Sequence, residues 1–278
     1  MHWLPLVVSL IAAALITPTT VRGLARQGLV RQNYRGASLA FPAGAGIVAS
    51  ALVALIVLAP LYSLVDADVF REGTFVAVIF VVGVAFLGLL DDMVGSDPRL
   101  PRGWRGHIGA LASGRLSTGA IKALGTLGLA LLVLAEPDAA AGEYLLAAAV
   151  LVLATNVFNL LDLRPGRSAK ALVLLGAGLL IGSGRGDPFF AVSLFVGPIL
   201  VALPFELREA AMLGDTGSNV VGAVAGVWLV LTLSTLGQAI AAGVLLVITV
   251  YGEFRSISEL IERTPGLRQL DLLGRSHA

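Results

Sequence analysis

Four aspartates stand at the ends of apolar segments, where charged side chains are costly to place in a membrane chain. Asp91 and Asp92 end an apolar run that begins at Thr74, and Asp162 and Asp215 stand beside later apolar runs. Intramembrane carboxylates need partners or a function. They could bind Mg²⁺, which prefers oxygen ligands and keeps water and phosphate oxygens as its other ligands, or one could be a general base. The alternative is that they only mark where helices meet water.

Amide and basic side chains accompany these carboxylates. Asn156, Asn159 and Asp162 recur every three residues at the end of one apolar run, so we expect them on one face of a helix. Lys122 stands at the start of another run. Carboxylates for a metal ion and a cation for a diphosphate are sufficient for phosphoryl transfer, which depends mostly on positioning and charge neutralisation.

The fourth aspartate lies in a glycine-rich turn that begins at Met212. Glycines at positions 214 and 217 flank Asp215, which predicts a tight turn with an exposed carboxylate. Thr216 and Ser218 are placed to cap the helix that follows. The alternative is that this turn is a helix cap and nothing more.

A basic segment precedes the second apolar run. Arg31, Asn33 and Arg35 could bind a phosphate, although a basic loop next to a membrane span needs no such function. Pro42 follows, and we expect it to open a helix. The glycines at 44 and 46 then allow another backbone to approach closely.

The composition defines an all-α, polytopic integral membrane protein. The chain has 278 residues, of which 57% are hydrophobic and 13% charged, and its mean hydropathy is +0.90; soluble domains carry about 25% charged residues. Cysteine is absent, which excludes disulfides and thiolate chemistry. Spans need ~20 residues each, and we expect about nine, at roughly 2–20, 42–65, 74–90, 119–135, 143–161, 171–184, 189–205, 216–236 and 238–252.

The distribution of basic residues predicts the orientation. With the N-terminus outside, 17 of the 19 lysines and arginines fall on the cytoplasmic side, as the positive-inside rule requires. The first span lacks a basic leader and a cleavage site, so we expect a retained helix and not a signal peptide. The basic loop 102–107 lies on the cytoplasmic side, and we expect its His107 to be a surface residue and not a catalyst. Residues 253–278 form a cytoplasmic tail.

The order of these motifs resembles a known superfamily. Pro-x-Gly-x-Gly, Asp-Asp-x-x-Gly, Lys, Asn-x-x-Asn-x-x-Asp and Gly-Asp-Thr-Gly-Ser follow one another over residues 20–255. This series resembles the polyprenyl-phosphate N-acetylhexosamine-1-phosphate transferases, which include the phospho-N-acetylmuramoyl-pentapeptide transferase of peptidoglycan synthesis. The resemblance implies Mg²⁺-dependent transfer of a phospho-sugar from a UDP-sugar to undecaprenyl phosphate, in the cytoplasmic membrane of a bacterium. The expected partners are that lipid, a nucleotide sugar, the membrane and, by analogy, a second copy of the chain; no nucleic acid is expected.

The resemblance also implies roles for residues. One of Asp91 and Asp92 would deprotonate the lipid phosphate, and Asp162 would join them in catalysis. Asp215 would ligate the metal together with Asp92. The substrates would be bound by Asn33, Arg35, Lys122, Asn156, Asn159 and Met212.

Three departures from the family pattern concern recognition of the donor. Pro165 replaces an aspartate, and Met212 replaces a phenylalanine that stacks on uracil in the family. The family's histidine-rich loop is replaced by a tail with Arg and Glu residues, whose single histidine is His277. Two alternatives therefore stay open: a non-catalytic homologue that binds a polyprenyl lipid or a partner protein in envelope assembly, and a transporter or flippase, which no motif specifically supports.

Overall fold

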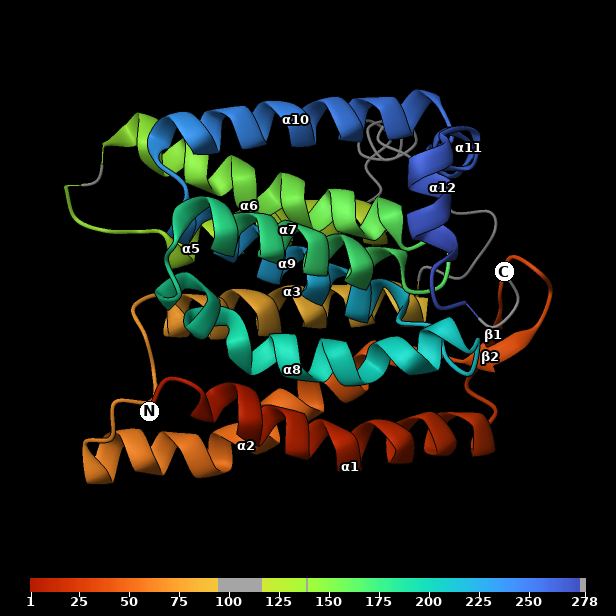
Figure 1. Ribbon diagram of the computed structural model, residues 1–278, viewed down its shortest axis with the longest axis horizontal. Helices are drawn as coiled ribbons and strands as arrows, with labels where there is room; N and C mark the ends of the chain where they lie inside the picture. The colour runs from red at the N-terminus through yellow and green to blue at the C-terminus, as the bar shows by residue number, and fades with distance from the viewer. Residues whose placement is uncertain (95–116, 139, 276–278) are drawn as a thin grey trace.

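Nine long helices dominate the computed structural model, which describes residues 1–94, 117–138 and 140–275. The helices run side by side along the long axis of the molecule (Figure 1). In chain order the long helices among these residues are α1 (Leu4–Arg26), α2 (Gly44–Val65), α3 (Thr74–Val94), α5 (Thr118–Val133), α6 (Ala141–Leu161), α7 (Arg167–Ser183), α8 (Asp187–Leu207), α9 (Gly214–Thr232) and α10 (Thr235–Phe254).

Six of these helices are long and apolar enough to cross a membrane: α1, α2, α3, α6, α8 and α10. The prediction of an all-α, multi-pass membrane protein is therefore confirmed in its main part: the described residues are nearly all helical, apart from two short strands. The remaining three include the two shortest, α5 with 16 residues and α7 with 17. The expected count of nine spans and the orientation of the termini stay predictions.

The helix α9 forms the centre of the bundle. Fifteen of its 19 residues are buried, which is the behaviour of a helix enclosed by neighbours on every side. It packs against α3, α6, α7 and α8, and its many glycines and alanines let those backbones approach closely. The helix α10 lies at the rim, where Leu245 is its single buried residue, so its apolar side chains are left for contact with lipid.

Two short strands interrupt the helical pattern. The strands β1 (Val30–Gln32) and β2 (Ser38–Ala40) pair antiparallel, and Ala40 also bridges to Ala211 just before α9. The sequence was expected to form only a loop here. Asn33 accounts for the hairpin, because its Oδ1 accepts the backbone N–H groups of Arg35 and Ala37 and closes the turn.

The second long helix begins at Gly44, two residues later than expected from Pro42. The close approach predicted for Gly44 is confirmed, since any Cβ added there would collide with the backbone of Gly217 in α9. The atoms nearest to a Cβ added at Gly46 belong to the side chain of Thr20, at ordinary contact distance.

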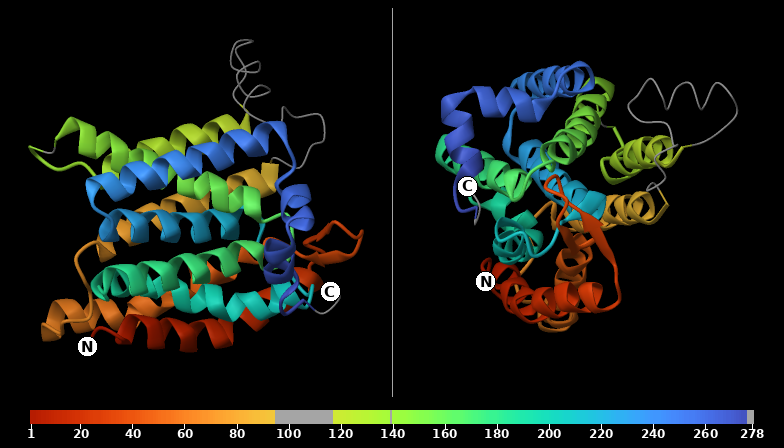
Figure 2. Two further views of the ribbon diagram at one scale, coloured as in Figure 1. Left: turned by 45° about the horizontal axis from the view of Figure 1, so that its top comes forward. Right: turned by 90° about the vertical axis from the view of Figure 1, so that its right-hand side faces the viewer.

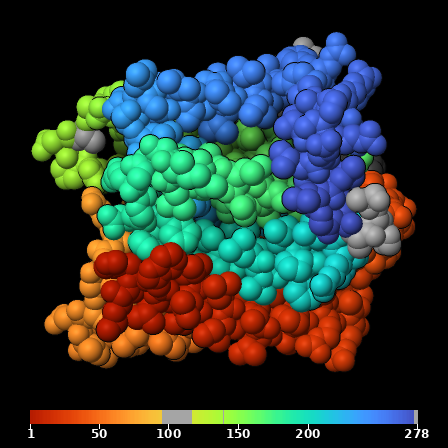
Figure 3. Space-filling view, in the orientation of Figure 1, coloured from red at the N-terminus to blue at the C-terminus, as the bar shows by residue number. Residues whose placement is uncertain are grey.

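The predicted tail folds back onto the bundle. Two short helices, α11 (Ile257–Arg263) and α12 (Pro265–Leu272), lie across the end that also carries β1 and β2 (Figures 1 and 3). The buried carboxylate of Asp271 is bonded by Arg167 Nε at 2.8 Å and by an Arg275 guanidinium nitrogen at 2.5 Å. We call the end with the strands and these two helices the hairpin end; it faces the viewer in the right panel of Figure 2.

Candidate functional site

The bundle brings all four aspartates to the hairpin end. Helices α3 and α6 terminate there and α9 begins there (Figure 1). Because successive helices run in opposite directions, motifs far apart in the sequence arrive at one end. The expectation that Asp91, Asp92, Asp162 and Asp215 share one face of the protein is therefore met, although the structure does not say which side of a membrane that face occupies.

Lys122 links two of the aspartates. Its Nζ lies 3.1 Å from Asp91 Oδ2 and also contacts Asp215 Oδ2. Lys122, Asp91 and Asp215 come from α5, α3 and α9, and their side chains are 19%, 19% and 29% exposed. We call these three residues, together with Asp92, the aspartate cluster. The three side chains are mostly shielded but open to a ligand. The ammonium offsets one of the two negative charges, whereas a divalent cation would offset both.

Asp92 has a different environment from its neighbour. Its Oδ1 accepts the Asp215 N–H at 2.9 Å, and its Oδ2 accepts the N–H of Thr216 at 2.8 Å and the Thr216 hydroxyl at 2.6 Å. Asp92 is 5% exposed. It therefore caps the first turn of α9 from another helix, where unsatisfied N–H groups and the positive end of the helix dipole favour a carboxylate.

The prediction that Thr216 and Ser218 cap the helix α9 is wrong. Leu213 occupies the N-cap position and makes no side-chain capping bond. Because α9 already begins at Gly214, both hydroxyl residues lie inside the helix. Thr216 donates its hydroxyl to Asp92, and Ser218 donates to Asn159.

Two glycines permit the contact between Asp92 and α9. A Cβ at Gly88, one turn before Asp92 on α3, would lie 2.5 Å from the carbonyl oxygen of Asp215. Gly214 has φ of +72°, and a Cβ there would lie 2.7 Å from Asp92 Oδ2. The sequence therefore contains small residues at the positions where α3 and the start of α9 touch.

The asparagine motif is divided between two environments. Asn159 donates to Asp215 Oδ2 at 3.4 Å and accepts from Ser218 at 2.9 Å, so it joins the aspartate cluster. Asn156 is exposed and donates to Thr249 in α10. At 3.6 residues per turn each step of three residues falls about 60° short of a full turn. Two such steps rotate Asp162 by about 120° from Asn156, so the three residues do not share one face.

The hairpin residues expected to bind phosphate pair with a different carboxylate. Asn33 Nδ2 donates to Glu209 Oε2 at 2.7 Å, and Arg35 lies 3.4 Å from Glu209 Oε1. Arg31 instead reaches the aspartate cluster, where a guanidinium nitrogen donates to the Asp92 backbone oxygen at 3.2 Å. The bond to Asp92 places Arg31 beside the aspartates, whereas the bonds of Asn33 and Arg35 place them beside Glu209.

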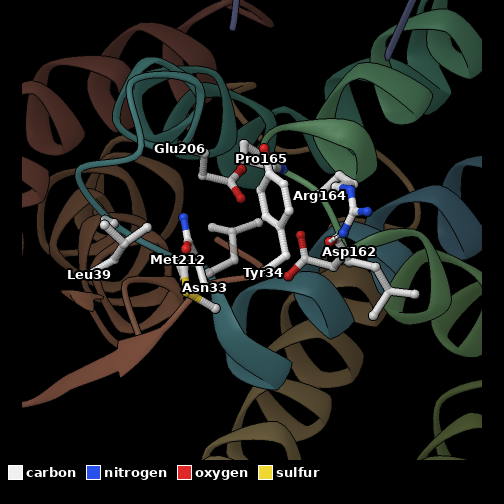
Figure 4. A pocket seen from close by; sticks show the side chains of 11 residues that line it. Asn33, Tyr34, Leu39, Asp162, Arg164, Pro165, Glu206 and Met212 are labelled. Atoms are coloured by element: carbon white, nitrogen blue, oxygen red, sulfur yellow. Dashed lines mark hydrogen bonds between the residues drawn. The ribbon is translucent and has the colours of Figure 1, made fainter. Parts of the chain in front are cut away.

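Asp162 and Met212 line a pocket beside the aspartate cluster (Figure 4). The empty space of the pocket is about 380 Å³ when the solvent at its open mouth is counted. Burial raises the pKa of the Asp162 carboxyl well above its usual range, and the charges of Glu206 and Asp215 add to that rise. A carboxyl that retains its proton to higher pH is better suited to hydrogen bonding than to binding a metal.

The pocket also contains a carboxylate that the sequence interpretation missed. Glu206 is 4% exposed and sits at the end of α8. The sequence does contain a signal for this residue, because Glu206 directly follows the apolar run 189–205, just as Asp91 follows the run that begins at Thr74. Pro165, one of the departures from the family pattern, lines the same pocket.

The aspartate cluster meets the requirements for Mg²⁺ in part. Among the residues that the structure describes, no three His, Cys, Asp or Glu side chains converge as metal ligands. Mg²⁺ usually takes one or two carboxylates and fills its other positions with waters and substrate phosphates. Asp91 and Asp215 fit this arrangement, since one ammonium touches both. Both oxygens of Asp92 are already engaged by α9, which makes Asp91 the better candidate for the ligand role expected of Asp92.

Several expectations fall outside the described residues, namely His107, its basic loop 102–107, and His277. Comparison with known proteins gave no assignment: no family model matches the chain, and no curated protein matches it. The geometry of the hairpin end is therefore the basis for a functional proposal.

Proposed function

We propose that the protein is a membrane phosphotransferase that moves a phospho-sugar from a nucleotide sugar to a polyprenyl phosphate, with Mg²⁺. The observation that supports this most is the convergence of Asp91, Lys122, Asn159 and Asp215 from four helices at one end of an apolar bundle. Such a site combines negative groups for a metal ion with a cation for phosphate oxygens. The apolar helices around it suit an acceptor with a long hydrocarbon chain.

Each side chain has a defined task in this proposal. Asp91 and Asp215 would hold Mg²⁺, which when bound would neutralise the donor diphosphate. Lys122 would move from the carboxylates to a phosphate oxygen, and Asn159 would keep Asp215 oriented. A carboxylate removes the remaining proton from the lipid phosphate, whose oxygen attacks the donor's β-phosphorus. The bond from that phosphorus to the bridging oxygen breaks, and the nucleoside monophosphate leaves with the bond electrons.

The placement in the membrane follows from the sequence. Nine spans with the N-terminus outside would place the hairpin end on the cytoplasmic side, where a bacterial cell holds its nucleotide sugars. The strong asymmetry of basic residues supports this orientation. The exposed apolar surface of α10 offers contact area for lipid or for a second copy of the chain.

Release of nucleoside monophosphate tests the proposal. Purified protein in detergent would be mixed with Mg²⁺, undecaprenyl phosphate and a panel of nucleotide sugars with different bases. We expect turnover with at least one donor, its loss in EDTA, and a fall of at least about 100-fold in Asp215→Asn, the range for removing a key electrostatic contact. Asp187→Asn, an exposed aspartate in the first turn of α8 far from the site, is the matched control and should keep full activity.

A non-catalytic lipid-binding homologue is the second candidate. It is favoured by the tail, where α12 docks on Arg167 through Asp271 and α11 pairs with Arg164 through Glu262, in the region for which the resemblance implied a histidine loop. Undecaprenyl phosphate that binds tightly without turnover of any donor would select this candidate over the transferase.

A further inference from the structure

Glu206 carries a buried acceptor that the described residues leave unused. Its Oε2 is fully shielded and has no hydrogen-bond partner among them, while the Gly166 N–H donates to the same carboxylate. A buried carboxylate oxygen without a donor is costly, and native proteins seldom retain one without a reason. The side chain lines the pocket and points toward its interior (Figure 4), so a ligand there could supply the missing donor.

An aromatic ring stands next to this acceptor. Tyr34 projects from the hairpin into the pocket between Glu206 and Arg164 (Figure 4). The Arg164 guanidinium lies over the ring, 4.1 Å from its centroid, and is itself held by Glu262 in α11 at 3.1 Å. Glu262 of the tail therefore positions Arg164, and Arg164 in turn positions the Tyr34 ring. A planar ring beside a carboxylate is a common arrangement for binding a nucleobase, by stacking and by hydrogen bonds to its edge.

We propose that Glu206 selects the base of the nucleotide donor and favours a base that presents N–H donors, guanine above all, over uracil. The inference rests on the proposed function, because a nucleotide sugar is what brings a base to this pocket. Guanine presents two adjacent N–H donors on its pairing edge, which match the two oxygens of a carboxylate. Uracil presents one N–H between two carbonyl oxygens, so a carboxylate that accepts the N–H faces at least one repelling oxygen.

The departures from the family pattern agree with a changed base site. Pro165 and Met212 line the same pocket as Glu206, and both replace residues that the resemblance associates with uridine. Met212 is held by its backbone, which bonds to Ala40 and Ala43 at 3.0 and 2.8 Å. Its flexible side chain can pack against bases of different size.

Equilibrium binding of GDP, CDP and UDP tests the inference. The full chain in detergent with Mg²⁺ would be titrated with each nucleotide by calorimetry. We expect GDP to bind about tenfold more tightly than UDP, a modest value for a matched against a mismatched polar edge. Glu206→Gln, which places an amide N–H near the base, should bring the ratio below threefold, and Glu143→Gln in the first turn of α6 should leave it unchanged.

The outcomes separate this inference from the proposed function. Equal or tighter binding of UDP by the wild-type chain would overturn the inference without any variant, and so would a GDP preference that survives in Glu206→Gln. Transfer from UDP-sugars by a chain that prefers UDP would overturn the inference and keep the proposed function. A GDP preference without turnover of any donor would support the base site and count against the transferase. Tyr34→Ala should weaken the binding of all three nucleotides by a similar factor, about tenfold for the loss of one stacking partner.

Discussion

Replacement of Asp92 should destabilise the protein more than replacement of Asp91, although the two carboxylates are adjacent in the sequence. Asp92→Ala removes a buried acceptor from two N–H groups and a hydroxyl at the start of α9. Loss of a helix cap costs about 0.5–2 kcal/mol, and a hydrogen bond to a charged group contributes about 1.5–3 kcal/mol. Because these contributions are not additive, we expect a loss of roughly 3–5 kcal/mol.

Asp91→Ala is the matched control for this experiment. The carboxylate of Asp91 is partly exposed, and its partner Lys122 keeps a second carboxylate, Asp215, when Asp91 is removed. Because Lys122 keeps a carboxylate partner after the change, we expect a loss of about 1 kcal/mol, the upper end of the range for exposed ion pairs, although this pair is mostly shielded. Both variants should lose turnover, but for different reasons: one disturbs the position of α9, while the other removes a candidate metal ligand.

The assay is thermal unfolding in detergent followed by tryptophan fluorescence, which can use the buried Trp228 of α9. At about 2–4 °C per kcal/mol for a chain of this size, Asp92→Ala should lower the apparent melting temperature by roughly 10 °C. Asp91→Ala should lower it by less than about 4 °C. An Asp92→Ala protein that has the melting temperature of the wild type but lacks all activity would refute the structural role of Asp92. That result would indicate that Asp92 takes part in the reaction itself.

Three further predictions concern packing, metal binding and pH. Gly88→Ala should destabilise by about 1–3 kcal/mol, the range for overpacking, because the new methyl would strike Asp215 in α9, whereas Gly128→Ala meets nothing within 4 Å and should melt unchanged. Lys122→Gln frees the two carboxylates that it bridges, so Mg²⁺ should raise its melting temperature at lower concentration than in the wild type; an identical titration would remove the lysine from the metal site. Burial raises the pKa of Asp271, but its two arginine partners outweigh burial and hold that pKa below the usual 3.8. The carboxylate therefore stabilises the docked tail above about pH 4, and that stabilisation should be lost as the pH falls through the lowered pKa, which proteolysis by pepsin at pH 2–4 would detect as cleavage of α12; resistance across that range would contradict it.

The elements of the fold could be predicted from apolar patterning, because lipid and the bundle core both demand apolar runs of helical length. The runs ending at Asp91 and beginning at Asp215 are α3 and α9. The hairpin could not be predicted in the same way. Its strands have three residues each, and they form because Asn33 closes a turn and Ala40 meets Ala211, a contact across 171 positions of sequence that no local pattern encodes.

The candidate site was predictable in its chemistry but not in its assignments. Residue type and position at the ends of apolar runs were enough to nominate Asp91, Lys122, Asn159 and Asp215, because a membrane chain seldom keeps such groups without partners. Tertiary structure decided which groups meet. The start of α9 needs an acceptor for its N–H groups, and the packing of α3 through Gly88 puts Asp92 there and leaves its neighbour facing Lys122.

The same division applies to the groups that sequence reasoning misplaced or missed. Asn156 belongs to the right motif, but helical rotation turns it toward Thr249. Glu206 belongs to no motif, and it gains meaning only because α8 ends beside Tyr34 and Asp162. The sequence by itself determined that carboxylates, amides and a lysine lie at the ends of membrane helices, because hydrophobic patterning is local. Only the tertiary structure decided that Asp92 caps a helix, that Asp91 pairs with the lysine and that one Glu206 oxygen has no hydrogen-bond donor among the described residues. The physical reason is that these environments are formed by helices that are distant in the chain.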